Sequence, residues 1–471
     1  MEKIINYKFV ISILVLFGVM TNCRKFVEVA PPKTQLVTTS VFSDNTTANS
    51  AVTSIYAQMF NSSNAYYIPF YTGLSSDELI SYSTVPDIIS FFNNGLSPLN
   101  NRVQNFWSDV YNYIYQTNSI IEGLRGNNIV TPEVKQQLIG EAQFFRALSN
   151  FYLTNLFGDI PLVTSTDYHV NALASRSPKS QIYRQIIKDL KDAENLLNIN
   201  FVGSDGVTLS DERVRPSKWA AKALLARVYL YTENWDSAEV EATQLISNPA
   251  FSLSSLDSVF LANSTEAIWQ IQPVSQDINT QEGYQFILLG APQTGNSNSS
   301  TLSSQLLNSF ELGDRRKINW VDSIIIESNI YYFPFKYKIF ESSVVSEYEM
   351  VLRLAEQYLI RAEARAQQGE SNAVNDLNII RNRAGLSNYS GPEDKASLLK
   401  AVAHERQVEF FAEWGHRWFD LIRTGAADSV LGSPGNICQT KGGQWSPNWK
   451  LYPIPQTERT NDSKLSQNNG Y

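Results

Sequence analysis

Four charged residues near the C-terminal end have spacings that could support acid–base chemistry. Arg406 and Glu409 lie three residues apart, as do Arg417 and Asp420. Residues three apart share one face of a helix, where opposite charges form ion pairs. Catalysis by two carboxyl groups would need them roughly 5–10 Å apart across a cleft. We therefore expect these residues to tie helices together rather than to form a catalytic site.

The sequence contains no GxSxG, HExxH or phosphate-loop pattern. Its three histidines (His169, His404 and His416) and two cysteines (Cys23 and Cys438) cannot be assembled into a Cys/His zinc site at ligand spacing. We expect no catalytic residue, no cofactor and no such metal site. A site built from carboxylates alone remains open, as does an exported glycoside hydrolase on a helical scaffold.

Aromatic residues are abundant, with 9 Trp, 23 Tyr and 24 Phe. A neutral sugar offers hydroxyl groups and an apolar C–H patch on each ring face, which a flat aromatic side chain matches while nearby polar groups bind the hydroxyls. Aromatic residues in polar loops are therefore the candidate ligand-binding residues, with half-buried packing as the alternative. They are Tyr66, Tyr67, Tyr71, Tyr82, Phe91, Phe92, Trp269, Tyr284, Trp320, Tyr331 and Tyr332. By contrast, helical spacing and context place Trp107, Tyr111, Trp219, Trp235 and Trp418 in the core.

Composition limits the class of partner. The chain of 471 residues has a formal net charge of −8, which argues against nucleic acid or anionic lipid headgroups as the main partner. It is 43% hydrophobic and 18% charged, so it can bury a large core. Its length predicts several domains or one large repeat fold.

The N-terminal segment has the pattern of an export signal. Lys3 and Lys8 precede an apolar run, 9–20, that is too short to span a membrane as a helix. Cys23 follows this run and resembles the acylated cysteine of a bacterial lipobox, although Asn22 replaces the usual small residue. We expect a signal peptide over 1–22, lipidation at Cys23 and an extended tether over 23–40; plain secretion and an uncleaved anchor are the alternatives.

The remainder, 41–471, is predicted to be a single helical domain. A helix is expected over 132–158, and helix pairs over 217–248 and 353–384, with small residues on facing stripes. These pairs resemble tetratricopeptide repeats, which must stack to bury their apolar faces. Weaker helix candidates are 104–125 and 179–199. The stretch 250–350 is predicted to be a loop-rich insertion with short strands.

Five sequence blocks occur in a characteristic order. They are the segment after Cys23, GEAQFFRALSNFYLTNLFGDIPLV at 140–163, RPSKWAAKALLARVYLY at 215–231, ERQVEFFAEWGHRWFDLIRTG at 405–425 and LYPIPQTERTNDSKLSQNNGY at 451–471. Together they resemble the SusD/RagB family of outer-membrane nutrient-binding lipoproteins. The resemblance covers essentially the whole mature chain. It implies a mainly α fold, an α-α superhelix of tetratricopeptide-like pairs carrying ligand-binding loops.

The resemblance also implies a function. Such proteins sit over a SusC-type TonB-dependent transporter, capture an oligosaccharide or sometimes a peptide, and are not enzymes. We therefore expect a lipid-anchored, cell-surface glycan-binding protein of the outer membrane. A tetratricopeptide adaptor that binds only protein is a further alternative. Ligand residues vary within the family, so no position can be transferred from it.

Overall fold

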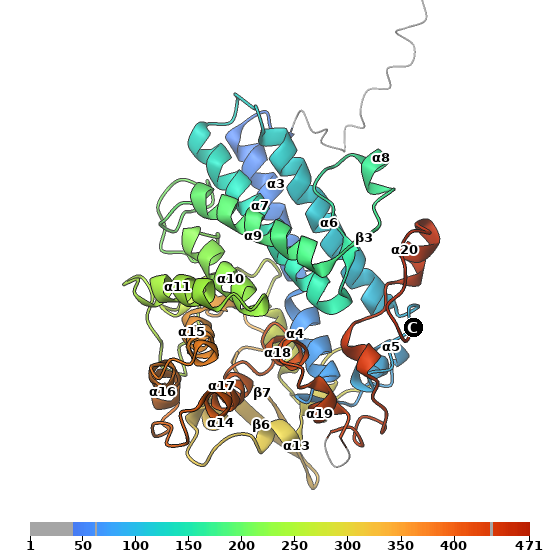
Figure 1. The fold of residues 1–471 in the computed structure, drawn as a ribbon, viewed down its shortest axis with the longest axis vertical. Helices are drawn as coiled ribbons and strands as arrows, with labels where there is room; N and C mark the ends of the chain where they lie inside the picture. The colour runs from blue at the N-terminus through green and yellow to red at the C-terminus, as the bar shows by residue number, and fades with distance from the viewer. Residues whose placement is uncertain (1–40, 62–63, 434–436) are drawn as a thin grey trace, which may run out of the picture.

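The computed structural model describes residues 41–61, 64–433 and 437–471. The predicted signal peptide, Cys23 and the tether lie outside these residues. Helices form most of the fold, and the longest ones stack in chain order, as Figure 1 shows. These scaffold helices are α3 (Asn45–Asn61), α6 (Asn101–Leu124), α7 (Pro132–Phe157), α9 (Lys179–Leu196), α10 (Lys218–Tyr231), α11 (Trp235–Ile246), α15 (Leu354–Gln368), α16 (Ala373–Arg383) and α17 (Lys395–Glu409).

The predicted helix pairs are confirmed. Helices α10 and α11 pack against each other, and the small residues on their facing stripes are fully buried, which allows close approach of the helix axes. Gly369 ends α15 in the left-handed conformation (φ 77°), which favours glycine. Asn372 precedes α16, and its side chain accepts no capping hydrogen bond from the first turn of that helix.

The helix array is continuous in space although the sequence interrupts it. Helix α11 precedes the 250–350 insertion and α15 follows it, yet the two pack directly against each other. Arg227 on α10 reinforces this junction with a bidentate ion pair to Glu356 on α15, with N–O distances of 2.6 and 2.7 Å. The two ends of the insertion therefore lie close together, and the helix array continues from α11 to α15 without a gap.

The insertion contains short strands, as predicted, and it also contains a helix, α12 (Gln281–Phe286). The SIIIESNIYYF region forms a hairpin, and β4 pairs with β8 while β1 pairs with β5. The strands are β1 (Leu79–Ser81), β2 (Ile160–Pro161), β3 (Arg176–Ser177), β4 (Ala267–Ile271), β5 (Ser300–Leu302), β6 (Val321–Ile326), β7 (Asn329–Pro334) and β8 (Glu349–Arg353).

Short helices fill the space beside the array and carry several candidate residues. Within the described ranges, no helix combines the length and apolar character needed to cross a membrane. The short helices are α4 (Asn64–Ser75), α5 (Pro86–Phe92), α8 (Tyr168–Asn171), α13 (Ser304–Leu307), α14 (Arg315–Asn319), α18 (His416–Arg423), α19 (Ala427–Leu431), η1 (Pro447–Lys450) and α20 (Gln456–Asn461).

Candidate functional site

The charged residues near the C-terminal end form ion pairs that are buried or half-buried, but not with the partners that their spacing suggests. Arg406 pairs with Asp420 at 2.7 Å, joining α17 to α18. Arg417 pairs with Asp77, which lies between α4 and β1, also at 2.7 Å. The expectation that these residues tie helices together is confirmed. The pairing within one helix turn is wrong, because partners on neighbouring elements satisfy the charges.

Glu409 lies at the centre of a larger buried network. It accepts hydrogen bonds from Arg316 at 3.0 Å, from Arg353 at 2.6 Å and from Arg383. Burial alone would raise the pKa of Glu409, but the surrounding guanidinium groups outweigh it and lower that pKa well below its usual value. Glu409 is 0% exposed and its charge is balanced by these arginines, so no substrate reaches it and the network is structural.

One cluster in the described part of the chain has donor atoms close enough for a metal ion: Glu311, His404 and Glu405. Both carboxylates are already engaged by guanidinium groups, Glu311 by Arg381 and Glu405 by Arg316. The positive charges of these arginines oppose a cation at the same oxygen atoms. The arrangement therefore fits an ion-pair cluster better than a metal centre.

Four candidate aromatic residues before the insertion are buried, so the expectation that they lie in open loops is wrong. Tyr67 and Tyr71 belong to α4, and Phe91 and Phe92 to α5; each is less than 9% exposed. The Tyr67 ring stacks on Phe106 at a centroid distance of 4.5 Å. Burial raises the pKa of both tyrosines. The polar residues around them fold into short helices whose aromatic side faces the core.

The two candidate tryptophans of the insertion are also buried, and this expectation is wrong as well. Trp269 lies in β4, and its Nε1 donates to the Val214 carbonyl at 3.0 Å. Trp320 donates to the Leu256 carbonyl at 2.9 Å, and the Nζ of Lys336 lies 4.9 Å from its ring. Both indole rings are 0% exposed, so no ligand reaches them in this structure.

Two of the remaining candidates meet at the surface. The rings of Tyr82 and Tyr331 contact edge to face with centroids 5.7 Å apart. Tyr82, which follows β1, is 39% exposed, and Tyr331, in β7, is half-buried. We call Tyr82 and Tyr331 the tyrosine pair. It presents apolar ring surface to solvent at a place where two segments distant in sequence meet.

Tyr332 lies on the other side of the hairpin. Successive strand residues point to opposite faces, so Tyr331 and Tyr332 cannot belong to one surface. Tyr331 pairs across the hairpin with Ile324 and packs against a small apolar cluster that includes Phe333. Tyr332 pairs with Ser323 and is 36% exposed. The two adjacent candidates are therefore separated by the strand itself.

The last two candidates are half-buried. The ring of Tyr284 on α12 stacks on Phe340 at a centroid distance of 5.0 Å. Phe340 packs against the same apolar cluster as Tyr331, so Tyr284 is linked to that cluster through its contact with Phe340. Tyr66 packs at the edge of the main core. Whether Tyr66, Tyr82, Tyr284, Tyr331 and Tyr332 bind ligand remains a prediction.

Polar groups beside the tyrosine pair complete the site, and sequence reasoning missed them. The backbone N–H of Tyr82 donates to the Ser299 carbonyl at 2.7 Å, and that of Thr84 donates to the Thr294 carbonyl at 2.9 Å. This pairing brings the exposed side chains of Gln293 and Thr294 next to the segment that carries Tyr82. Within the described ranges no hydrogen bond occupies these side chains. Their position within the turn-rich run GAPQTGNSNS, at 290–299, was the available signal.

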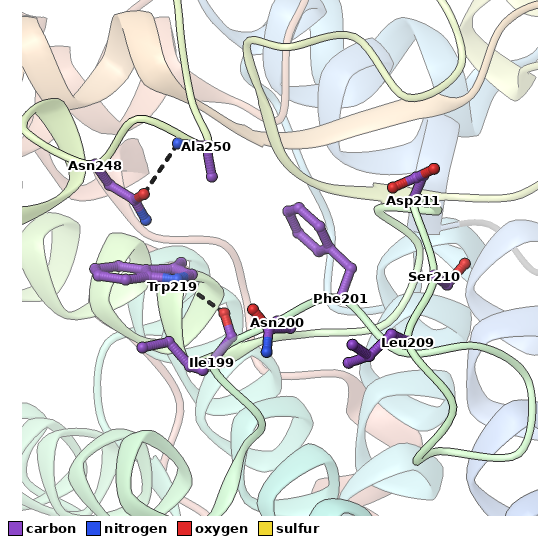
Figure 2. Close-up of a pocket in the computed structure, with 9 residues that line it drawn as sticks. All are labelled: Ile199, Asn200, Phe201, Leu209, Ser210, Asp211, Trp219, Asn248 and Ala250. Atoms are coloured by element: carbon purple, nitrogen blue, oxygen red, sulfur yellow. Dashed lines mark hydrogen bonds between the residues drawn. The ribbon is translucent and has the colours of Figure 1, made fainter.

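Sequence reasoning also missed an open cavity on the scaffold. Figure 2 shows its lining, which includes the rings of Trp219 and Phe201, and its volume is about 510 Å³. Trp219 was expected in the core, and the structure places it half-buried at the edge of the core instead. Trp235 is likewise half-buried, whereas Trp107 and Trp418 are buried as predicted.

Helix pairs of the tetratricopeptide type that carry a loop-rich insertion define a helical scaffold protein. Comparison with known proteins identifies its family. A family model described as starch-binding associating with outer membrane matches residues 25–230, and the SusD family model matches residues 321–471. The chain belongs to the SusD family.

Relatives and solved structures agree with this assignment. A SusD-like protein, P25, of Formosa agariphila is 25% identical and aligns with 96% of this chain and 97% of its own. A SusD superfamily structure from Bacteroides vulgatus covers 91% of this chain and 99% of its own, with TM-score 0.79 and 23% identity. Surface glycan-binding protein A from Bacteroides fluxus covers 90% and 99%, with TM-score 0.74 and 21% identity.

Proposed function

We propose that this protein is a cell-surface lipoprotein that binds a glycan and delivers it to a SusC-type TonB-dependent transporter of the outer membrane. The observation that carries this proposal is the tyrosine pair. Two partly exposed rings in edge-to-face contact, beside side chains with free hydrogen-bonding groups, suit a ligand that is apolar on its ring faces and polar at its rim.

The ligand class is supported by charge as well as by shape. The exposed side chains next to the pair, Gln293 and Thr294, are uncharged and offer both donors and acceptors. A neutral oligosaccharide needs this combination, whereas a charged ligand would need a matching charge. One relative by fold is named as a surface glycan-binding protein, and one matching family model is described as starch-binding. Peptides or other nutrients are the alternative ligands within the same family.

Binding rather than catalysis is supported by the state of the charged residues. Sequence spacing offered Asp420 and Glu409 as acid–base candidates. Glu409 is buried, Asp420 is half-buried, and arginines hold both carboxylates. The opposing arginines lower the pKa of both carboxyl groups despite their burial. A general acid needs a raised pKa near neutrality, so neither group is suited to protonate a glycosidic oxygen.

Attachment to the membrane rests on the sequence. Cys23 lies three residues after the end of the short apolar run 9–20, and acylation there would hold the helical domain on a bilayer. The outer membrane is supported by the description of the family model that begins at residue 25. A transporter partner follows from the resemblance alone.

Affinity electrophoresis tests the proposal. The protein is run through native gels that contain a neutral polysaccharide such as starch, laminarin, xylan or mannan, and we expect one of them to slow its migration. Tyr82→Ala should reduce the retardation, whereas Tyr115→Ala, which alters an exposed tyrosine on α6, should not. Release of reducing sugar from the retarding polysaccharide would contradict the binding proposal and favour an exported hydrolase.

A further inference from the structure

The cavity around Trp219 and Phe201 lies on the helical scaffold rather than in the insertion. Its residues come from the segment between α9 and α10, from the start of α10 and from the chain after α11. Figure 1 shows α10 and α11 at the left of the molecule, whereas the β6–β7 hairpin that carries Tyr331 lies at the bottom. The cavity and the tyrosine pair are therefore separate places on the protein.

The aromatic walls of the cavity are held in fixed positions. The Nε1 of Trp219 donates to the Ile199 carbonyl at 2.9 Å, which sets the orientation of the indole ring. The guanidinium group of Arg213 lies over the Phe201 ring at 4.8 Å. The same group donates to the Ala250 carbonyl at 2.9 Å and the Ala267 carbonyl at 2.6 Å. A ligand that meets these rings does not have to order them first.

The loop that carries Phe201 is also anchored. Val202 and Leu209 form an antiparallel bridge, and Asp205 accepts hydrogen bonds from the backbone N–H groups of Val207 and Thr208 at 3.0 and 2.9 Å. Arg215, itself paired with a buried glutamate, donates to the Ser204 carbonyl at 2.9 Å. These contacts fix the loop to the scaffold, so the cavity keeps its shape without a ligand.

Polar side chains in the cavity have free hydrogen-bonding groups. The carboxamide of Asn200 and the carboxylate of Asp211 are exposed, and neither forms a hydrogen bond to another described residue. The hydroxyl oxygen of Ser210 accepts from the Glu212 N–H at 3.1 Å, which leaves its proton free to donate. Figure 2 shows these three side chains in the same cavity as the two rings. Together they offer donors and acceptors around apolar faces.

We infer that this cavity is a second carbohydrate-binding site, separate from the tyrosine pair, that takes one or two rings of a neutral sugar. Its volume lies within the range of small-molecule pockets, which is about 300–1,000 Å³. Ring faces would contact Trp219 and Phe201, while hydroxyl groups would bind Asn200, Ser210 and Asp211. The choice of a neutral sugar rests on the proposed function, whereas the existence of the site rests on the cavity. A polysaccharide bound at two places on one protein dissociates more slowly than one bound at a single place.

Fluorine NMR on protein labelled with 5-fluorotryptophan tests this inference. The Trp219 resonance is assigned with Trp219→Phe, and the labelled protein is titrated with neutral gluco-, xylo- and manno-oligosaccharides. We expect the Trp219 signal to shift in a saturable way. The double variant Asn200→Ala/Asp211→Ala should weaken the binding that this signal reports by about tenfold. Ser204→Ala, which alters an exposed residue of the same loop outside the cavity, should leave it unchanged.

The outcomes separate this inference from the proposed function. A Trp219 shift that persists in Tyr82→Ala supports a second site. Calorimetry could instead detect oligosaccharide binding that Tyr82→Ala abolishes, while the Trp219 signal does not shift. The second site would then be wrong, and the proposed function would stand. If Asn200→Ala/Asp211→Ala abolishes all binding and Tyr82→Ala none, the cavity is the sugar site and the role of the tyrosine pair is wrong. Absence of any binding contradicts both.

Discussion

The rings of Tyr82 and Tyr331 touch edge to face at the surface, with centroids 5.7 Å apart. One residue follows β1 near the N-terminal end of the described chain, and the other lies on β7 in the insertion. Edge-to-face contact leaves part of each ring free for a ligand while fixing its orientation. The fold thus joins two distant segments into one exposed aromatic surface, which neither segment could form alone.

The scaffold itself depends on buried charge, and Arg227 with Glu356 is the clearest case. Both side chains are at most 2% exposed, so Arg227→Met leaves an uncompensated carboxylate and should lower the free energy of unfolding by about 3–5 kcal/mol. Arg227→Met/Glu356→Met should recover most of the loss. The exposed pair Lys188–Asp192 is the control, since Lys188→Met should cost less than about 1 kcal/mol. Urea unfolding measures all of these, and equal losses for the single and double variants would refute the explanation.

Trp320 is expected to affect stability rather than ligand contact. Its ring is 0% exposed and packs beneath the cations of the buried network, so Trp320→Ala should lower the free energy of unfolding by about 3–5 kcal/mol. Tyr115→Ala, at a 53% exposed position, should change it by less than about 0.5 kcal/mol. The comparison is made by urea unfolding. If the Trp320→Ala protein is folded and as stable as the wild type but no longer binds oligosaccharide, the structural role is wrong and Trp320 contacts the ligand.

Buried carboxyl groups predict an unusual dependence of stability on pH. Burial raises the pKa of Glu78 to about 8 and that of Glu349 to about 8, against a usual value of 4.5. The folded protein holds these protons to higher pH than the unfolded chain does. Their contribution is therefore complete below pH 4.5 and is lost as pH rises through about 8.

Glu78→Gln tests this dependence, because glutamine stays neutral at every pH. Between pH 5 and pH 7 we expect wild-type protein to lose roughly 1–2 kcal/mol more unfolding free energy than Glu78→Gln. Glu341→Gln, at an exposed glutamate, serves as control and should follow the wild type. Parallel curves for wild type and Glu78→Gln in urea unfolding would show that Glu78 is ionised in the fold.

Lipidation predicts a difference between the two cysteines. Cys23→Ala should move the protein from the membrane fraction to the aqueous fraction, because the acyl chains would then have no attachment point. Cys438 is buried in the described structure, and Cys438→Ala should leave the protein in the membrane fraction. Fractionation of cells followed by immunoblotting measures this. Membrane association that survives Cys23→Ala would instead support an uncleaved anchor.

The sequence predicted the scaffold well because helix pairs are specified locally. The spacing of Ala223, Ala226, Ala238 and Ala242 defines two apolar stripes without knowledge of the rest of the chain. The same local logic predicted short strands within 250–350, where β4, β5, β6 and β7 lie.

Aromatic exposure could not be predicted in the same way. Tyr67 and Trp269 stand in polar surroundings along the chain, but Phe106 and Phe144, which are distant in sequence, cover them in the fold. Trp219 shows the opposite error, because its helical stripe indicates burial while the loop beside it stops short of covering the ring. Which partner covers a ring depends on tertiary packing, which spacing does not encode.

Isothermal titration calorimetry with the neutral oligosaccharide whose polysaccharide retards the protein tests the central claim most directly. We predict that Tyr82→Ala and Tyr331→Ala each weaken the affinity by about tenfold or more. Tyr115→Ala, which alters an exposed tyrosine on α6, should change it less than about twofold. Undiminished binding in both Tyr82→Ala and Tyr331→Ala would contradict the account.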